Sequence, residues 1–408
     1  MAIKPVKSLP PVQSQISIRG LASIADRAQQ TLTNLRDDLL EPHPRKVAPH
    51  FTSGKVAKLC GIERTDLNYL CTRGNKGTYP VGTLTGSSRS RMFTLAEAQE
   101  FVRANGQYQA RPAGQRAIVC AVGNFKGGVG KTTLTVAIAQ GLTLRGHKVC
   151  LVDLDPQASS TTLMGYVPDA EITEDMTVMR VVYGDEVDLQ YAPIASYWDG
   201  LDLIPSCPAL FGADYYLPNK QVQDPSFEFW KVLDKALDPL RDKYDIILID
   251  TPPTLSYLAI SSFMATDGLI VPLPPETLDY ASSTQFFRQF ADLFSSLQDS
   301  KSVEKNFEFI KIVLSKVKAS AATTPVVKAW IKQTYHELLA TAEIIDTDIV
   351  MNASAEFQTV YDITAYDGSQ RTLNRALDSF DAVVDEVEAS VQNAWKRRIA
   401  AESEAGNG

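Results

Sequence analysis

Residues 123–133 read GNFKGGVGKTT, between an apolar run at 117–122 and a helical pattern that begins at Lys131. Glycines in this stretch let backbone N–H groups turn inward around phosphate oxygens, and the helix that follows adds the positive end of its dipole. Lys131 is placed to reach the β- and γ-phosphates of a nucleotide, and the Thr132 hydroxyl is placed to bind Mg²⁺. The stretch therefore predicts a phosphate-binding loop in an α/β domain.

Two acidic stretches end apolar runs farther along the chain. Residues 152–157 read VDLDPQ, and residues 245–253 read DIILIDTPP. Because the carboxyl ends of parallel strands face the ligand crevice, we expect Asp153, Asp155 and Asp250 to lie near the phosphate loop. Any one of these aspartates alone could equally cap a helix or lie on the surface. Their order after the loop favours a shared site.

Strand-like and helix-like stretches alternate from residue 117 onwards. Such alternation indicates a parallel sheet covered by helices on both faces. We therefore predict a P-loop nucleotide-binding fold, with a helix at about 131–145 that Gly146 is well placed to end. The predicted strands are 117–122, 147–152, 244–249, 268–271 and 309–314.

The phosphate loop departs from the ordinary pattern, which has Gly where this chain has Phe125, and Lys126 precedes the glycines. KGGVGKTT resembles the deviant Walker motif shared by ParA, MinD and related ATPases. The resemblance implies that Lys126 reaches across a dimer to the partner's phosphates and that Asp155 orients the attacking water. It also implies an ATP/ADP site and a Mg²⁺ site. The nucleotide would be held by Lys126, Gly127, Gly128, Val129, Gly130, Lys131, Thr132 and Thr133, and the ion by Thr132, Asp153 and Asp250.

The N-terminal part of the chain is basic. Residues 1–116 carry 17 Lys and Arg against 8 Asp and Glu, whereas the whole chain has a net charge of −8. This asymmetry suggests a basic module joined to an acidic globular one, although surface charge without a binding role would give the same counts. Residues 53–70 have the small and apolar framework of a helix-turn-helix. Its second helix would present four polar side chains to DNA: Arg64, Thr65, Asn68 and Tyr69.

The flanks of this pattern favour a winged helix-turn-helix. Residues 72–92 are rich in turn residues and could form a β-wing on the DNA backbone, or a solvated loop, and they carry Arg73, Lys76, Arg89 and Arg91. Thr94 and Glu97 form a capping-box signature for a helix that ends near Ala104. Long ParA proteins resemble this layout, since they carry such a domain and use it to repress their own operon, whereas short ParA proteins and MinD lack it.

The first helix is predicted over residues 18–40. Six residues step by four and three along it at coiled-coil spacing: Leu21, Ala25, Ala28, Leu32, Leu35 and Leu39. Packing within its own domain is the alternative, but the narrow seam and the EPHP break at 41–44 favour dimerisation. The predicted domains are a dimerisation helix (1–45), a winged helix-turn-helix domain (46–112) and an ATPase domain (113–408).

The resemblance implies an ATP-dependent DNA-partition ATPase that also represses its own operon. It would form an ATP sandwich dimer, bind non-specific DNA through candidates such as Arg371 and Arg375, and hydrolyse ATP faster with a ParB-type partner. A nucleotide-sensing repressor without a transport role is the alternative. The acidic tail after Trp395 argues against a MinD-like membrane helix. The chain has five scattered cysteines and no CxxC pair, which argues against a cluster-bearing reductase and a disulfide framework. We expect a cytoplasmic protein associated with the nucleoid.

Overall fold

The computed structural model describes residues 17–40, 45–74, 77–86, 90–106, 108–318, 321–364 and 368–405. The chain forms two compact units, Met1–Arg45 and Lys46–Gly408. Of the described helices, none has the length and apolar character that crossing a bilayer requires.

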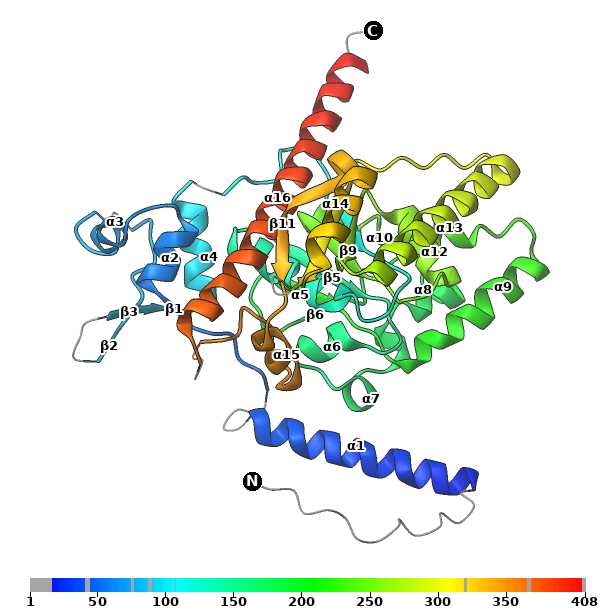
Figure 1. Ribbon diagram of the computed structural model, residues 1–408, viewed down its shortest axis with the longest axis horizontal. Helices are drawn as coiled ribbons and strands as arrows, with labels where there is room; N and C mark the ends of the chain where they lie inside the picture. Colours follow the sequence, from blue (N-terminus) through cyan, green and yellow to red (C-terminus); the bar gives the residue numbers. More distant parts are fainter. Residues whose placement is uncertain are drawn as a thin grey trace. The chain divides into compact units, whose positions relative to one another are not determined.

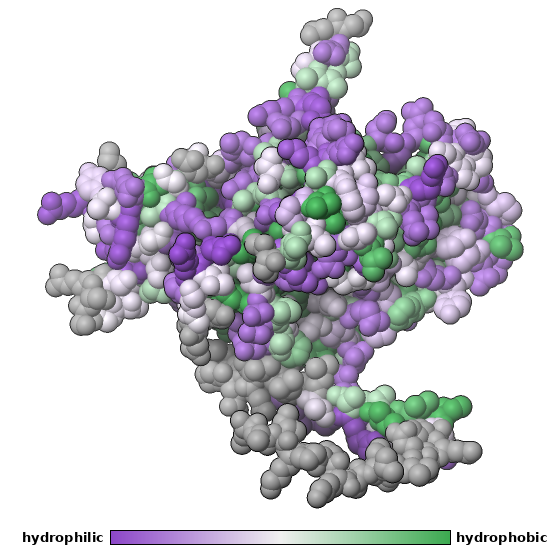
Figure 2. Space-filling view, in the orientation of Figure 1, coloured by the Kyte–Doolittle hydropathy of each residue, from purple (hydrophilic) through white to green (hydrophobic). Residues whose placement is uncertain are grey.

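The smaller unit contains helix α1 (Ile18–Leu40), at the predicted residues. Ile18 and Leu21 are 86% and 57% exposed, and Figure 2 shows hydrophobic colour along this helix. The first part of the predicted seam is therefore exposed in a single chain. The side chains of Leu32, Leu35 and Leu39 lie outside the described residues.

The larger unit begins with short helices and a small sheet. Thr52 caps the first helix by accepting a hydrogen bond from the Lys55 amide, and Gly61 takes φ +62° in the turn before the second helix. The predicted capping box of Thr94 and Glu97 is confirmed. Strand β3 pairs antiparallel with both β1 and β2. The elements are β1 (Phe51–Thr52), α2 (Ser53–Leu59), α3 (Arg64–Leu70), β2 (Thr83–Thr85), β3 (Ser90–Phe93) and α4 (Leu95–Ala104).

An 8-stranded sheet forms the centre of the larger unit, in the order β11-β10-β9-β4-β8-β5-β7-β6. All neighbouring strands are parallel except β6 and β7. The strands are β4 (Ile118–Val122), β5 (Val149–Asp153), β6 (Ile194–Ala195), β7 (Leu201–Ile204), β8 (Ile246–Asp250), β9 (Gly268–Leu273), β10 (Phe309–Val317) and β11 (Leu339–Ile345).

Helices cover both faces of this sheet, which confirms the predicted fold class (Figure 1). The α-helices are α5 (Lys131–Leu144), α6 (Ser159–Leu163), α7 (Pro168–Glu171), α8 (Met179–Tyr183), α9 (Ala213–Gln223), α10 (Val232–Leu237), α11 (Leu240–Lys243), α12 (Tyr257–Ala265), α13 (Thr277–Lys301), α14 (Thr324–Tyr335), α15 (Asp348–Ala355) and α16 (Gln370–Ala405). The 3-10 helices are η1 (Glu174–Met176), η2 (Pro208–Gly212), η3 (Phe229–Lys231) and η4 (His336–Leu338).

The two faces are set by the alternation of side chains along each strand. On β4, Ile118, Cys120 and Val122 pack with residues of α4, α5 and α16, whereas Val119 and Ala121 pack with residues of α10, α12 and α13. Both sets are buried, so the strand reads as a continuous apolar run. A Cβ at Gly141 of α5 would lie 2.6 Å from Val384, and this glycine therefore allows α16 to pack closely on the helix that follows the phosphate loop.

Candidate functional site

The phosphate loop joins β4 to α5 at the carboxyl edge of the sheet. Gly128 and Gly130 have φ angles of +75° and +92°, in the left-handed region that side chains disfavour. Helix α5 begins directly afterwards at Lys131, so its free backbone N–H groups open onto the loop. This is the strand–loop–helix arrangement that binds phosphate.

Lys131 is buried within the loop. Its Nζ donates to the backbone carbonyl of Lys126 over 3.1 Å. Burial lowers the pKa of its ammonium group, and the nearby charges of Asp250 and Asp155 oppose that shift. The lysine thus lies between the loop and the acidic residues.

Asp153 and Asp250 end adjacent strands and lie opposite each other in the register of β5 and β8. The Asp250 carboxylate accepts hydrogen bonds from Ser160 Oγ over 2.8 Å and from Thr135 Oγ1 over 3.3 Å. The Asp153 carboxylate accepts two bonds of 2.8 Å from Thr161, one from the amide and one from the hydroxyl. Helix α6 therefore supplies donors to both carboxylates.

The two buried carboxylates are suited to a divalent cation. Burial raises the pKa of Asp250 to about 6, although Thr132, Ser160 and Lys131 partly offset this shift. Burial also raises the pKa of Asp153 well above its usual range, and the charge of Asp250 adds to that effect. A Mg²⁺ ion would offset the mutual repulsion, and the Thr132 hydroxyl lies beside Asp250 to complete an oxygen donor set. Among the described residues, no cluster of three or more His, Cys, Asp or Glu could bind a metal ion.

Asp155 lies in the tight loop between β5 and α6. Its amide donates to Asp153 Oδ1 over 3.2 Å, and its own carboxylate accepts the Gln157 amide over 3.0 Å. The Ser206 hydroxyl holds its backbone carbonyl over 2.6 Å. Ala158 closes the loop with φ +54°, a left-handed conformation that is costly for alanine. The backbone of Asp155 is therefore fixed beside the buried acids while its side chain is half-buried.

Lys126 is paired with an acid of its own chain. Its Nζ lies 2.8 Å from Asp279 Oδ1 near the start of α13, and the side chains are 34% and 7% exposed. Lys126 thus lies at the predicted loop position, and here its charge is satisfied in cis. A role in trans requires it to leave Asp279.

Sequence reasoning did not identify several residues that complete the site. Asp279, Thr135 and Ser206 are single polar residues whose role depends on tertiary contacts. Residues 159–162, which follow VDLDPQ, all carry hydroxyl groups, and this feature of the sequence indicated the two donors on α6. Lys316, near the end of β10, has φ +51° and donates to the Gly128 carbonyl over 2.7 Å.

The predicted DNA-binding residues differ in their exposure and in their hydrogen bonding. Arg64, Thr65 and Tyr69 are exposed on α3, Asn68 is half-buried there, and Arg73 is exposed just after the helix. On β3, Arg91 donates to the Val81 carbonyl over 2.6 Å, so its guanidinium is partly used within the hairpin. Arg89 and Lys76 lie outside the described residues.

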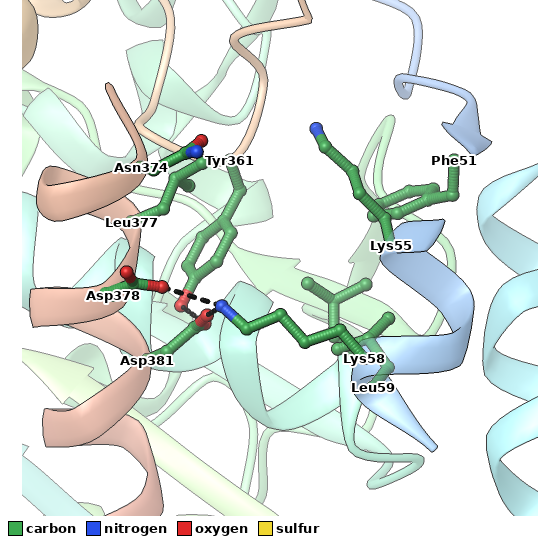
Figure 3. Close-up of a pocket in the computed structure, with 10 residues that line it drawn as sticks. Phe51, Lys55, Lys58, Leu59, Tyr361, Asn374, Leu377, Asp378 and Asp381 are labelled. Atoms are coloured by element: carbon green, nitrogen blue, oxygen red, sulfur yellow. Dashed lines mark hydrogen bonds and ion pairs between the residues drawn. The ribbon is translucent and has the colours of Figure 1, made fainter. Parts of the chain in front are cut away.

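Helix α2 faces the start of α16 across a pocket of about 400 Å³ (Figure 3). Lys58 spans the two helices, with its Nζ 2.7 Å from Asp378 and 3.6 Å from Asp381. Arg371 and Arg375 are exposed on the first turns of the same helix α16. These arginines and α3 belong to one compact unit.

Comparisons with known proteins agree with this architecture. The family described as AAA domain matches residues 117–309, which include the phosphate loop, both acidic stretches and strands β4 to β9. SopA of Escherichia coli strain K12 is 29% identical over 378 residues, covering 90% of this chain and 94% of SopA. The similarity to SopA therefore extends over both the basic N-terminal part and the nucleotide-binding part.

Two solved structures have the same fold. A structure described as Partition Protein matches with a TM-score of 0.64 at 19% identity, covering 91% of this chain and 98% of that protein. At that identity the match concerns the fold. Cobyrinic acid a,c-diamide synthase from Mycobacterium smegmatis, solved with a bound ATP analog and magnesium, matches with a TM-score of 0.51 at 25% identity. That match covers 66% of this chain and 93% of the synthase.

Proposed function

We propose that this chain is a ParA/SopA-like partition ATPase that binds ATP and Mg²⁺ at the loop 123–133, hydrolyses ATP, and segregates DNA. One observation carries the proposal: Lys131, Thr132 and the Asp153–Asp250 pair meet at the end of the sheet, in a chain similar to SopA over nearly its whole length. The proposed domains are residues 1–45, 46–112 and 113–408.

The chemical step is attack of a water oxygen on the γ-phosphorus, with cleavage of its bond to the bridging oxygen and release of ADP and phosphate. Lys131 contacts the β- and γ-phosphates, and Asp155 orients the water at the half-buried edge of the site. Thr132, Asp153 and Asp250 would hold the cation. Mg²⁺, when bound, supplies positive charge at the phosphate oxygens. Because Ser160 and Thr161 already fix the carboxylate oxygens of Asp250 and Asp153, these side chains would bind the ion with little rearrangement.

The active form in this proposal is an ATP sandwich dimer that binds DNA without sequence preference. Lys126 leaves Asp279 and contacts the partner's phosphates, which adds a cation in trans. A ParB-type centromere-binding protein stimulates hydrolysis and releases the DNA. Arg371 and Arg375, exposed on α16, are the proposed phosphate contacts for non-specific DNA. The protein would work in the cytoplasm, on the nucleoid.

The N-terminal elements are proposed to read an operator and repress the protein's own operon. Helix α3 exposes Arg64, Thr65 and Tyr69, and the β2–β3 hairpin follows it as a wing would. Helix α1, with its exposed apolar residues, is proposed to join two chains independently of nucleotide.

Binding to two kinds of DNA tests this function. The purified protein is mixed with ADP, ATP or a non-hydrolysable ATP analogue, and with either the duplex upstream of its own reading frame or a random duplex. We expect the random duplex to be bound with ATP or the analogue and not with ADP, and the upstream duplex to be bound specifically. Specific binding without ATP-dependent binding to random DNA would indicate a nucleotide-sensing repressor and exclude the partition function.

A further inference from the structure

Lys46, the first residue of the larger unit, is a buried lysine with a complete set of partners. Its side chain is 8% exposed, and its Nζ lies 2.8 Å from Asp362 Oδ2. The same ammonium group donates to the carbonyl of Leu163 over 2.9 Å and to that of Phe357 over 2.8 Å. It also lies 4.3 Å from the ring centroid of Tyr197. One side chain thus connects segments that are far apart in the sequence.

Asp362 in turn is held from several sides. It accepts hydrogen bonds from the Tyr197 hydroxyl over 2.7 Å and from the Thr359 amide over 2.7 Å. The same Tyr197 oxygen accepts a bond of 2.8 Å from Gln140, which belongs to the helix that follows the phosphate loop. The lysine is therefore fixed in place by a buried network and does not sample solvent freely.

Leu163, one of the two carbonyl partners of Lys46, is the last residue of α6. The carbonyls of a last helical turn lack intrahelical donors, and a cation there is favourable. The same five-residue helix contains Ser160, which donates to Asp250, and Thr161, which donates to Asp153. One end of α6 thus fixes the carboxylates, and Lys46 fixes the other end.

The backbone near both carbonyl partners is strained. Ala158, immediately before α6, and Phe357 have φ angles of +54° and +55°, in the left-handed region. Such conformations are costly for residues with a side chain and persist where the surroundings enforce them. Because α6 has only five residues, its own hydrogen bonds cannot enforce its position.

We infer that Lys46 is a positioning residue for the Mg²⁺–nucleotide site, which holds α6 so that Ser160 and Thr161 keep Asp250 and Asp153 in their binding geometry. It touches neither substrate nor metal in this account and acts through the Leu163 carbonyl. The inference rests on the proposed function of the site as a Mg²⁺–ATP site. It gives Lys46, which precedes β1, a function beyond its place in the chain.

The test measures Mg²⁺ dependence rather than turnover. A fluorescent non-hydrolysable ATP analogue is bound to the full chain while Mg²⁺ is titrated, and the melting temperature of each variant is measured alongside. In Lys46→Met, which keeps the aliphatic stem, the Mg²⁺ concentration for half-maximal binding should rise about tenfold, the lower end of what outer-shell partners of metal sites contribute. Lys46→Arg, which keeps a charged donor, should restore most of that loss.

Lys305→Met is the matched control. Lys305 is also buried and also donates to two carbonyls, those of Met264 and Thr266, but these belong to the segment that enters the amino end of β9. Its removal should lower the melting temperature and leave the Mg²⁺ midpoint unchanged. The double variant Lys46→Met, Asp362→Asn removes both charges of the buried pair, and it should fold and show the same raised midpoint if Lys46→Met alone does not fold.

The outcomes separate the inference from the function on which it rests. Wild-type protein that fails to bind the analogue at any Mg²⁺ concentration would remove the proposed function. Wild-type binding with an unchanged Mg²⁺ midpoint in folded Lys46 variants would overturn the inference alone. An equal rise of the midpoint in Lys305→Met would also overturn it, because the effect would then follow from lost stability.

Discussion

The ammonium group of Lys126 lies 2.8 Å from a carboxylate oxygen of Asp279 in the same chain. Asp279 is buried near the start of α13, whereas Lys126 is partly exposed at the loop. The lysine expected to act on a partner's nucleotide is therefore held in cis in the single chain. If Lys126 acts in trans as proposed, its release from Asp279 is a step of dimer formation.

Asp279→Asn should make dimer formation easier, because the neutral amide no longer holds the Lys126 ammonium. Since the pair is partly exposed, the gain should be below about 1 kcal/mol, or up to about fivefold in the dissociation constant of the ATP-bound dimer. Sedimentation with the non-hydrolysable ATP analogue measures it, using a chain that begins at residue 46 so that α1 does not contribute. Weaker dimerisation in the variant would mean that the ion pair supports the dimer.

Asp155→Ala should bind ATP and lose turnover. Its backbone is held by Asp153 and Ser206 independently of its carboxylate, so the loop should keep its shape. Loss of a water-orienting group should slow hydrolysis about 100-fold or more. Phosphate release and ATP calorimetry check this, with the exposed Asp169→Ala as the control that keeps activity. Equal loss of binding and turnover would assign Asp155 to the metal instead.

Arg64→Ala and Asn68→Ala should weaken operator binding by about 1–3 kcal/mol each if they contact base edges. Binding of the ATP form to random DNA should barely change, because it is proposed to use α16. Arg288→Ala, an exposed arginine on α13, is the control for loss of one positive charge. Equal losses on both DNAs would show that α3 contacts phosphates without reading sequence.

Mg²⁺-dependent nucleotide binding should weaken as the pH falls through about 6, where Asp250 takes up a proton. The pKa of Asp250 is raised in the folded chain. The free energy of unfolding that protonated Asp250 contributes in the absence of metal is therefore fully present below pH 3.8 and is lost as the pH rises through about 6. Mg²⁺ and nucleotide should therefore raise the melting temperature more at pH 7 than at pH 5. Asp250→Asn should show a weaker dependence on pH, with Asp153 as the remaining carboxylate of raised pKa at the site. A wild-type response that does not depend on pH would contradict the raised pKa.

The sequence predicted best where the interactions are local. Helix α1 has the predicted bounds, the Thr94–Glu97 capping box is present, and the phosphate loop joins β4 to α5 as expected. The strand at 147–152 was placed two residues early, because the buried His147 extends the apolar pattern before pairing begins at Val149. Strands β6, β7 and β11 were not predicted. β6 and β7 have only two and four residues. β11 has seven residues, but most of them are partly exposed, so it lacks a continuous apolar run.

The contacts that complete the site could not be predicted in this way. Lys46, Asp362 and Asp279 are single charged residues with no pattern around them. Only the folded chain brings Lys46 to Asp362 and Lys126 to Asp279. The hydroxyl-bearing residues that follow VDLDPQ indicated that α6 could donate hydrogen bonds. Their acceptors, Asp153 and Asp250, are identified only by the pairing of β5 with β8, which places the two carboxylates opposite each other.

Mixing Lys126→Ala with Asp155→Ala tests the central claim, an ATP sandwich dimer with a lysine that acts in trans. Each variant alone should be inactive in hydrolysis. A mixed dimer contains one site in which the Asp155 of one chain meets the Lys126 of the other. If Lys126 acts in trans, ATP hydrolysis should return in the mixture, provided that subunit exchange is shown independently. A mixture as inactive as its two components, with exchange demonstrated, would contradict the account.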